Sequence, residues 1–229
     1  MQNLDMYADF EPLIPFDREI EFLHKTYLDK LLDLGAKTIL DVGCGSGDFL
    51  LLSKENAIAC KGIDLSEKMV LNACKKGANA EKRDLNDESG FYDALTAIFD
   101  VVNYIAPSEL ANFFISAKNR LNRGGFFIFD INTLYGFQDV ASGSISLEKD
   151  GLFGSVRSEF ADQKLISDFD LFTKIGEVYK RDSWSIEQFY HSDREIENAL
   201  KTAGFSSVKT ENIKLYGTKP DKKLYITGF

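Results

Sequence analysis

The chain has few residues of the kinds that build disulfide frameworks, metal sites and membrane spans. Its 229 residues include three cysteines and two histidines, and the cysteines show no paired spacing of the type that binds metal ions. An odd, scattered set of cysteines is typical of reduced core residues in an intracellular protein. No hydrophobic run approaches the roughly 20 residues that a membrane helix needs, and the N-terminal segment lacks the apolar core of a signal peptide. We therefore expect a cytoplasmic protein with no metal and no membrane partner.

Positive charge is also scarce. The chain has 27 lysine and arginine residues against 36 aspartate and glutamate residues, which gives a formal net charge of −9. Proteins that bind nucleic acid usually present a basic face to the phosphates, so we expect no nucleic-acid partner. The hydrophobic content of 44% is ordinary for a globular protein with a proper core. The length fits one domain, residues 1–229.

The most informative segment present is a glycine-rich stretch, residues 39–49, with the sequence ILDVGCGSGDF. A short apolar run containing Asp41 leads into Gly43, Gly45 and Gly47, after which an amphipathic stretch begins. This order predicts a strand, a tight loop and the start of a helix. Glycines let the backbone adopt positive φ and let a ligand lie directly against it, and a helix N-terminus behind the loop offers unpaired N–H groups to an anion.

The spacing and the acids around this loop narrow the choice of ligand. The pattern is G-x-G-x-G, whereas the dinucleotide fingerprint is G-x-G-x-x-G, and no G-K-[ST] follows as in a P-loop. Asp41 lies just before the loop, where a carboxylate would repel a pyrophosphate but pair with an ammonium group. Asp64 ends the next apolar run about twenty residues on, where an acid can hold a ribose diol, and Asp84 lies a similar distance further along. A ligand with an amine, a carboxylate, a ribose and an adenine fits this set, and S-adenosylmethionine is such a ligand.

With these motifs in this order, the chain resembles the class I S-adenosylmethionine-dependent methyltransferases over nearly its whole length. The resemblance implies an α/β fold with a Rossmann-like, doubly wound, mostly parallel seven-stranded sheet that ends in a C-terminal antiparallel hairpin. It implies that S-adenosylmethionine is the cofactor and S-adenosylhomocysteine its product. It places Asp41 and the glycines at the methionine part, Asp64 at the ribose and Asp84 near the adenine. The cofactor-binding residues that it implies are Asp41, Gly43, Cys44, Gly45, Gly47, Asp64, Leu65, Met69, Asp84, Leu85 and Phe99.

The rest of the chain up to Thr133 alternates between strand and helix patterns. Apolar residues near helical spacing predict a first helix over residues 17–34. The βα alternation after it predicts a parallel sheet with helices on both faces and a ligand outside the carboxyl ends of the strands. The expected strands cover residues 37–42, 57–63, 78–83, 91–98 and 126–131, and the expected helices cover residues 47–55, 66–76 and 107–121.

After Thr133 the rhythm changes. Short alternating stretches within residues 145–186 predict a small antiparallel sheet. We interpret residues 136–190 as a lid insertion, since in similar small-molecule methyltransferases an insertion at this point covers the active site; a purely structural flap is the alternative. The expected lid stretches are 154–160, 165–173 and 177–183, followed by a helix over 192–202 and a closing hairpin with strands over 206–215 and 223–229.

Methyl transfer from a sulfonium is an in-line displacement in which positioning contributes much of the rate, so no dedicated catalytic residue is required. A neutral acceptor atom must still lose a proton, which a general base can take. The candidates for catalysis are Asp130, Tyr104 and His191, with His24 a weaker choice because it lies within a predicted helix. The residues expected to contact the substrate are Tyr7, Asn103, Asn132 and Tyr135.

The expected acceptor is a small polar metabolite of the sugar, nucleotide-sugar or amine type, methylated at nitrogen or oxygen. The lid, the acidic surface and the absence of an added recognition domain favour it. Two alternatives stay open. Methylation of RNA or protein would be accompanied by a basic groove or an added domain, and a regulatory protein would bind S-adenosylmethionine without catalysis. Monomer and homodimer are both compatible with the sequence.

Overall fold

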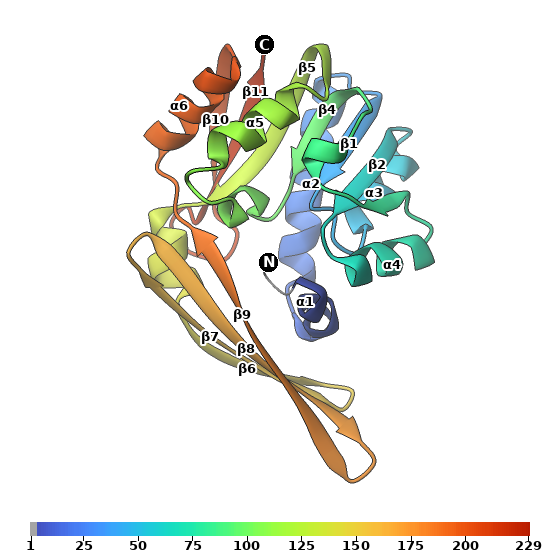
Figure 1. Ribbon diagram of the computed structural model, residues 1–229, viewed down its shortest axis with the longest axis vertical. Coiled ribbons are helices and arrows are strands. Elements are labelled where there is room, and N and C mark those ends of the chain that lie inside the picture. The colour runs from blue at the N-terminus through green and yellow to red at the C-terminus, as the bar shows by residue number, and fades with distance from the viewer. Residues whose placement is uncertain (1–3) are drawn as a thin grey trace.

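The computed structural model describes residues 4–229, which form a seven-stranded sheet and a separate four-stranded sheet (Figure 1). The strand order of the larger sheet is β10-β11-β5-β4-β1-β2-β3. Strands β1 to β5 are parallel, β11 is antiparallel to β5, and β10 is antiparallel to β11. The expected fold class is therefore confirmed. The strands are β1 (Thr38–Val42), β2 (Ala59–Asp64), β3 (Ala80–Lys82), β4 (Tyr92–Ala97), β5 (Leu121–Asn132), β10 (Ser207–Ile213) and β11 (Lys222–Gly228).

Helices cover both faces of the larger sheet. On one face α5 and α6 pack against Phe127 and Phe129 of β5, and on the other face α2 packs near Ile128 of the same strand. Successive β5 residues therefore enter opposite cores, as expected of a strand that is buried on both sides. None of the helices within residues 4–229 is long and apolar enough to cross a membrane. The α-helices are α1 (Leu4–Phe10), α2 (Asp17–Asp33), α3 (Asp48–Glu55), α4 (Glu67–Lys75), α5 (Leu110–Lys118) and α6 (Asp193–Ala203), and the shorter helical turns are η1 (Glu11–Leu13), η2 (Leu85–Asp87), η3 (Val101–Tyr104) and η4 (Gly136–Ala141).

Local sequence signals fix the ends of the helices that border the ligand-binding edge. The Ser66 hydroxyl accepts the backbone N–H of Met69 at 3.2 Å and so caps α4 directly after β2. Ser192 and Glu195 form a capping box at the start of α6, and Gly204 ends this helix with a φ of 85°. The first cap fixes the loop after the parallel strand β2, and the second fixes the connection between the smaller sheet and α6.

Several boundaries and two whole elements, the leading helix and the first strand of the smaller sheet, differ from the expectation. The helix expected from residue 107 begins at Leu110, because residues 107–109 form a turn before it. The strand expected from residue 126 begins at Leu121, and its register with β4 shifts around Gly124, which has a φ of 78°. The leading segment, for which no helix was expected, forms α1.

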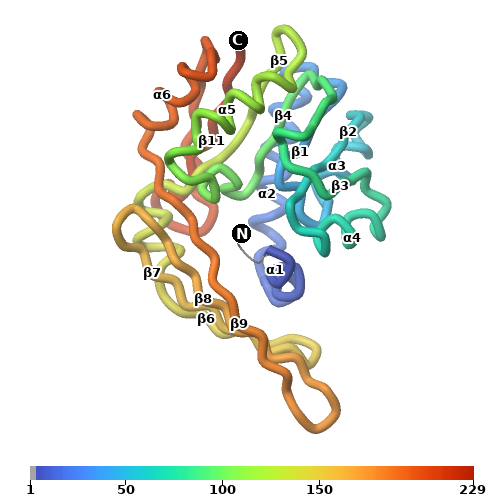
Figure 2. The backbone as a smooth tube through the Cα atoms, viewed as in Figure 1, coloured from blue at the N-terminus to red at the C-terminus, as the bar shows by residue number. Residues whose placement is uncertain are grey.

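The four-stranded sheet is antiparallel, has the order β6-β7-β8-β9, and lies within the span expected for the lid. It projects away from the larger sheet, so that its far end extends beyond the rest of the molecule (Figures 1 and 2). The first strand was not among the predicted stretches, although Ile145 and Leu147 alternate with polar residues in it, and most of its side chains are exposed. The strands are β6 (Gly143–Lys149), β7 (Leu152–Ala161), β8 (Lys164–Ile175) and β9 (Val178–Phe189).

Candidate active site

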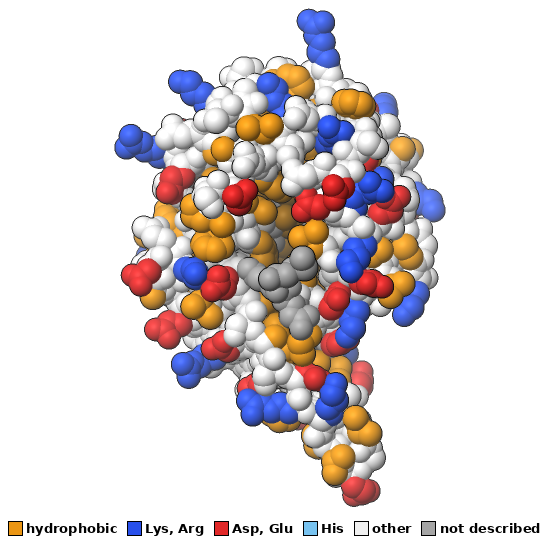
Figure 3. All heavy atoms as spheres, in the orientation of Figure 1, with side chains coloured by type: hydrophobic (Ala, Val, Ile, Leu, Met, Phe, Trp, Pro, Cys, Tyr) orange, Lys and Arg blue, Asp and Glu red, His pale blue; other side chains and the backbone are white. Residues whose placement is uncertain are grey.

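A cleft of about 1880 Å³ opens at the carboxyl ends of the parallel strands. The loops after β1, β2 and β4 line it together with the N-terminal segment and the lid sheet. Small-molecule pockets typically measure about 300–1,000 Å³, so this cleft has room for a cofactor and a second molecule. Acidic side chains lie around the apolar patch at the centre of the face drawn in Figure 3. The cleft is at the edge of the sheet where α/β proteins of this type bind their ligands.

The glycine loop between β1 and α3 requires glycine for two different reasons. Gly43, Gly45 and Gly47 have φ angles of 73°, 51° and 80°, a region that favours glycine. A Cβ on Gly43 would lie 2.7 Å from Cγ2 of Val101, and one on Gly47 would lie 2.8 Å from Cβ of Ala73. Gly45 has open space around it, so a ligand can approach the backbone there.

Cys44, inside the same loop, is a packing residue. Its Sγ would lie 2.6 Å from a Cβ on Gly62, so the thiol occupies the space that the glycine of β2 leaves. Its backbone N–H donates to the carbonyl of Ile63 at 3.1 Å. Burial raises the pKa of the thiol, which therefore stays protonated and unreactive at neutral pH.

The two acids nearest the glycine loop have different environments. Asp64 accepts the backbone N–H groups of Gly45 at 2.9 Å and Ser66 at 2.8 Å, while burial raises the pKa of its carboxyl. Asp41 is buried and accepts the Thr96 hydroxyl at 2.6 Å, and burial raises its pKa to about 7. A carboxyl with such a pKa ionises readily when a cation binds beside it.

The remaining predicted cofactor residues line the same cleft. Met69 is at the start of α4, Leu65 precedes that helix, and Phe99 follows β4. Asp84 accepts the backbone N–H of Asn86 at 2.8 Å and so begins the turn η2. All eleven residues predicted to bind the cofactor thus border one cleft, and their individual contacts with the cofactor stay predictions.

The N-terminal segment crosses the cofactor side of the cleft. The Ser46 hydroxyl, within the glycine loop, donates to Glu11 at 2.9 Å. The Ser66 hydroxyl, two residues after Asp64, donates to Asp5 at 2.7 Å. Neither Asp5 nor Glu11 was among the predicted site residues, because nothing local in the sequence connects them with loops that follow tens of residues later.

The same segment also contacts the lid. The ring of Tyr7, a predicted substrate residue, lies edge-on to Phe169 with centroids 5.9 Å apart. Phe10 lies edge-on to Phe169 at 5.2 Å and to Trp184 at 6.1 Å. The N-terminal segment therefore links the glycine loop to the lid sheet, and Tyr7 lines the cleft between them.

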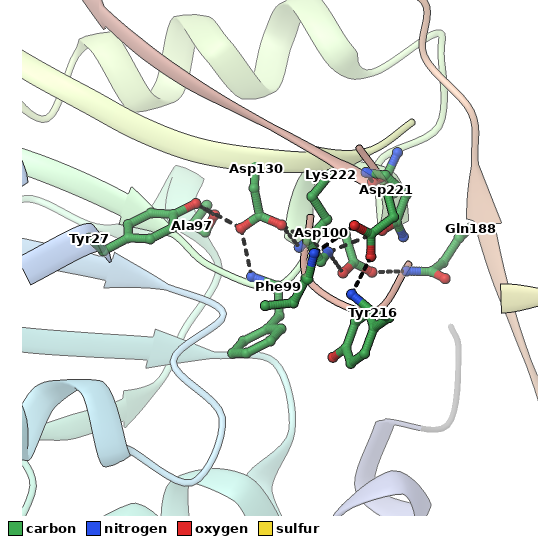
Figure 4. A network of polar contacts seen from close by, with 12 residues as sticks. Tyr27, Ala97, Phe99, Asp100, Asp130, Gln188, Tyr216, Asp221 and Lys222 are labelled. Atoms are coloured by element: carbon green, nitrogen blue, oxygen red, sulfur yellow. Dashed lines mark hydrogen bonds and ion pairs between the residues drawn. The ribbon is translucent and has the colours of Figure 1, made fainter. Parts of the chain in front are cut away.

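A buried lysine organises the other side of the cleft (Figure 4). Lys222, at the start of β11, is 2% exposed, and its three ammonium N–H donors match three acceptors. Its Nζ lies 2.9 Å from Oδ2 of Asp130, 3.0 Å from Oδ1 of Asn132, and against Oδ1 of Asp100. The attraction of the two carboxylates outweighs the effect of burial and raises the pKa of Lys222, which stays charged.

Asp130 has a structural place in this network, which differs from the expected role as a base. It is fully buried and is not among the residues that line the cleft. Its carboxylate accepts from the Tyr27 hydroxyl at 2.7 Å and from the backbone N–H groups of Phe99 at 2.9 Å and Asp100 at 3.0 Å, besides Lys222. With its acceptor positions occupied and no access to the cleft, Asp130 holds the loop after β4.

That loop carries an unusual backbone. Phe99 and Asp100 both have positive φ, 61° and 55°, although neither is glycine. Such conformations cost free energy and persist only when surrounding contacts enforce them, which the Asp130 carboxylate does. The result is that the Asp100 side chain lines the cleft, where Gln188 of the lid donates to its Oδ2.

The other two catalytic candidates are unsuited to act as bases. Tyr104 lines the cleft, but burial and the nearby Asp100 carboxylate raise the pKa of its hydroxyl, so it stays protonated at neutral pH. His191 is buried away from the cleft, where its Nε2 lies 3.1 Å from the carbonyl oxygen of Ile105, and burial lowers its pKa. His24 does line the cleft, and burial lowers its pKa to about 4.

Besides Tyr7, three residues were predicted to contact the substrate, and one of them, Asn132 of β5, lines the cleft. Asn103 is buried and joins three elements, donating to the carbonyl of Phe189 at 2.8 Å and accepting the backbone N–H of Asn132 at 2.9 Å. Tyr135 lies outside the cleft lining, with the Lys219 ammonium over its ring. Sequence reasoning missed the cleft residues Glu11, Asp100, Gln188, Tyr216 and Lys222.

Comparisons with known proteins agree with this geometry. Residues 39–125 match a family model described as a methyltransferase domain. The putative methyltransferase YqeM of Bacillus subtilis is 26% identical over 212 residues, which cover 87% of this chain and 83% of that protein. A solved S-adenosylmethionine-dependent methyltransferase from Clostridium acetobutylicum superposes with a TM-score of 0.78 at 22% identity, covering 96% of this chain and 94% of that one. The sugar N-methyltransferase KedS8 from Streptoalloteichus superposes with a TM-score of 0.77 at 20% identity, covering 100% and 93%.

The fold and the acid-flanked glycine loop are those of the class I methyltransferases, and the matched segment contains that loop. The chain matches a methyltransferase-domain model over residues 39–125 and has the fold of solved S-adenosylmethionine-dependent methyltransferases, with an additional four-stranded antiparallel sheet.

Proposed function

We propose that the enzyme transfers a methyl group from S-adenosylmethionine to a nitrogen or oxygen atom of a small polar metabolite of the sugar, nucleotide-sugar or amine type. The observation that carries the proposal is that one cleft of about 1880 Å³ is lined both by the glycine loop and by polar side chains from distant elements, and we assign the two groups to two parts of the cleft. One part has the glycine loop and its acids, and the other has the polar side chains of Asp100, Gln188 and Asn132 under the lid.

The residues on the cofactor side fit S-adenosylmethionine. The tight packing of Gly43 and Gly47 leaves no room for a side chain, so the loop presents its backbone to the ligand. We assign the methionine ammonium to Asp41, the ribose hydroxyls to Asp64 and the adenine to the surroundings of Asp84. When bound, the cofactor supplies an electrophilic methyl group on a sulfonium.

The protein residues contribute position and exclusion of water rather than acid–base chemistry. Asp130 and Lys222 hold the loop after β4, whose residues Phe99, Asp100 and Val101 line the cleft. The lid and the N-terminal segment cover the site from the other side. Positioning of this kind contributes much of the rate of an in-line displacement. Among the candidates for a base, Tyr104 stays protonated, Asp130 and His191 are buried away from the cleft, and His24, with a pKa of about 4, is a weak base.

Two observations favour a small acceptor over RNA or protein. Acidic side chains outnumber basic ones among the cleft-lining residues within 4–229, and a phosphate-binding groove would have the opposite balance. The similar structure KedS8 is described as a sugar N-methyltransferase. A cleft narrowed by a lid suits a metabolite that can be enclosed.

The test is formation of S-adenosylhomocysteine by the purified protein across a panel of acceptors. The panel contains nucleotide-linked amino sugars, the corresponding hydroxyl sugars, polyamines, transfer RNA and a basic protein. We expect turnover with at least one small acceptor and none with RNA or protein. Turnover with RNA or protein alone would support the second hypothesis, and cofactor binding without any turnover would support a regulatory protein.

A further inference from the structure

One carboxylate faces the acceptor part of the cleft at the point where it meets the cofactor part. Asp100 is followed by Val101, whose Cγ2 would lie 2.7 Å from a Cβ on Gly43, so the loop after β4 touches the glycine loop directly. The parallel pairing of Asp41 with Thr96 puts β1 and β4 side by side up to this point. Asp100 therefore lies next to the methionine end of the cofactor site, where the methyl group is transferred.

The Lys222 network contains more negative than positive groups. The network contains one ammonium, Lys222, and two carboxylates, Asp130 and Asp100. Asp130 is fully buried and saturated with donors, whereas Asp100 lines the cleft. The network thus contains one more carboxylate than ammonium, and its member at the cleft wall is Asp100, which pairs with Lys222 through Oδ1 and accepts from Gln188 through Oδ2.

Aromatic side chains line the same cleft as this carboxylate. They are Tyr7, Tyr104, Tyr216 and Phe99, and Tyr7 and Tyr104 pack against one apolar cluster. Burial first, with the Asp100 carboxylate among the nearby charges, raises the pKa of the three tyrosine hydroxyls. The hydroxyl groups of Tyr27, Tyr92 and Tyr225 form hydrogen bonds with protein atoms. The three hydroxyls that line the cleft have no such partner within residues 4–229. They are available to a ligand.

Hydrogen bonds to its backbone fix the position of Tyr216. Asp221 accepts the backbone N–H groups of Leu215 at 2.6 Å and Tyr216 at 2.8 Å, and the Tyr216 ring lies edge-on to Phe16 at 5.1 Å. Figure 4 shows the Tyr216 ring below Asp100 and Gln188, on the open side of the network. A carboxylate among aromatic faces is the arrangement by which proteins bind ammonium groups.

We propose that the acceptor atom is the nitrogen of a positively charged amine, and that Asp100 and the rings of Tyr7, Tyr104 and Tyr216 bind it. The inference rests on the proposed methyl transfer and specifies its acceptor. It assigns the acceptor to nitrogen rather than oxygen, because a neutral hydroxyl gains little from a carboxylate among aromatic rings.

The chemistry balances without a protein base. The amine binds as an ammonium and gives one proton to water, which leaves a lone pair on nitrogen. That lone pair forms the new N–C bond while the C–S bond breaks and both its electrons stay on sulfur, which becomes the neutral thioether of S-adenosylhomocysteine. The product nitrogen is again a cation, and it faces the same carboxylate until it leaves.

The test uses two cofactor analogues, so it does not require the acceptor to be known. S-adenosylhomocysteine is neutral at the reacting position, whereas sinefungin carries an ammonium group there. Calorimetry gives the ratio of their dissociation constants for the whole chain and for Asp100→Asn, which keeps an oxygen acceptor and suits a left-handed backbone. We expect the preference for sinefungin to fall about tenfold, as expected for loss of one nearby charge in a partly buried site.

The control is Glu148→Gln, which removes the same charge from the lid side of the cleft, and it should change the ratio less than twofold. If Asp100→Asn does not fold, Tyr216→Leu, at a side chain that is 40% exposed, should lower the preference roughly two- to fivefold through the lost aromatic face. An unchanged ratio in a folded variant that binds both analogues overturns the inference. Failure of the unmodified chain to bind either analogue overturns the proposed function instead.

Discussion

The two sides of the cleft that we propose bind the cofactor and the acceptor, called here the cofactor side and the acceptor side, are built in different ways. The cofactor side consists of short loops that directly follow β1, β2 and β3, with backbone groups and glycines at its surface. The acceptor side consists of side chains from elements far apart in the chain: Asp100 after β4, Asn132 of β5, Gln188 of β9 and Lys222 of β11. The first is a local structure, and the second exists only when the whole sheet and the lid are assembled.

This difference has an energetic consequence. On the cofactor side the side chain of Asp64 is bonded to backbone amides and that of Asp41 to the Thr96 hydroxyl, and neither has an ion-pair partner within residues 4–229, so we expect a substitution there to change ligand affinity more than folding. On the acceptor side a fully buried ammonium is held between carboxylates, and removal of one partner leaves a buried charge unpaired. Four predictions test this contrast, from the largest expected effect to the smallest.

Lys222→Met should lower the free energy of unfolding by about 3–5 kcal/mol, the usual cost of breaking a buried ion pair. Its neighbour Lys223 pairs with Asp193 at the surface, so Lys223→Met is the matched control and should cost at most about 1 kcal/mol. Urea unfolding followed by circular dichroism measures both. Equal effects of the two substitutions would show that the buried network does not support the acceptor side.

Asp64→Ala should weaken binding of S-adenosylmethionine by about 1–3 kcal/mol, through lost hydrogen bonds to the ribose. It also removes the acceptor of the Gly45 and Ser66 N–H groups, so Asp64→Asn, which keeps one oxygen, should be intermediate. Calorimetric titration gives the affinities. Unchanged affinity in the alanine variant would refute the ribose assignment.

The pH dependence of cofactor binding should report Asp41. Its pKa is raised to about 7 in the folded protein, and only the ionised form attracts the methionine ammonium. Affinity for S-adenosylmethionine should therefore rise roughly tenfold between pH 6 and pH 8. The free energy of unfolding should change in the opposite direction and fall as the pH rises. A carboxyl whose pKa is raised by folding stabilises the fold fully below its ordinary pKa, and this contribution is lost as the pH rises through about 7.

Titrations and urea unfolding at pH 6, 7 and 8 measure both trends. Asp41→Asn is the control, because an amide cannot titrate, and it should flatten both. A pH dependence that persists in this variant would assign the effect to another group.

Phe153→Ala, at the far end of the lid, should have the smallest effect. The side chain is 38% exposed and lies against Phe172, so we expect a loss of stability below about 1 kcal/mol. The dissociation constant for S-adenosylhomocysteine should stay within a factor of two, because the residue is outside the cleft lining. A large loss of affinity would show that the whole lid, rather than its inner half, shapes the site.

The same contrast explains which parts could be predicted from the sequence. The glycine loop, Asp41 and Asp64 were predicted because their spacing along the chain is a direct consequence of a strand–loop–helix unit. Asp130 was chosen as a base because it ends a strand, yet its partners Tyr27 and Lys222 come from 103 and 92 residues away. Contacts over such separations depend on strand order and register, which no local pattern encodes.

The lid shows a related limit. The alternating stretch 165–173 predicted β8. In β9 the predicted stretch 177–183 covers the exposed half, while the half with alternating burial, from Trp184 onward, was missed, and so was β6, which is exposed on most of its length. The leading helix α1 was missed because it is short and its contacts, such as Asp5 with Ser66, lie outside its own sequence. Gln188 alternates correctly within β9, but only the folded lid brings it to Asp100.

Hydrogen exchange with and without S-adenosylhomocysteine tests the division of the cleft most directly. We predict slower exchange in the glycine loop and in the segments around Asp64 and Asp84, with slowing also in the N-terminal segment that contacts Ser46 and Ser66. The outer part of the lid, residues 150–153 and 174–178, should not change. Protection confined to the lid or to the Lys222 network, with the glycine loop unaffected, would contradict the account.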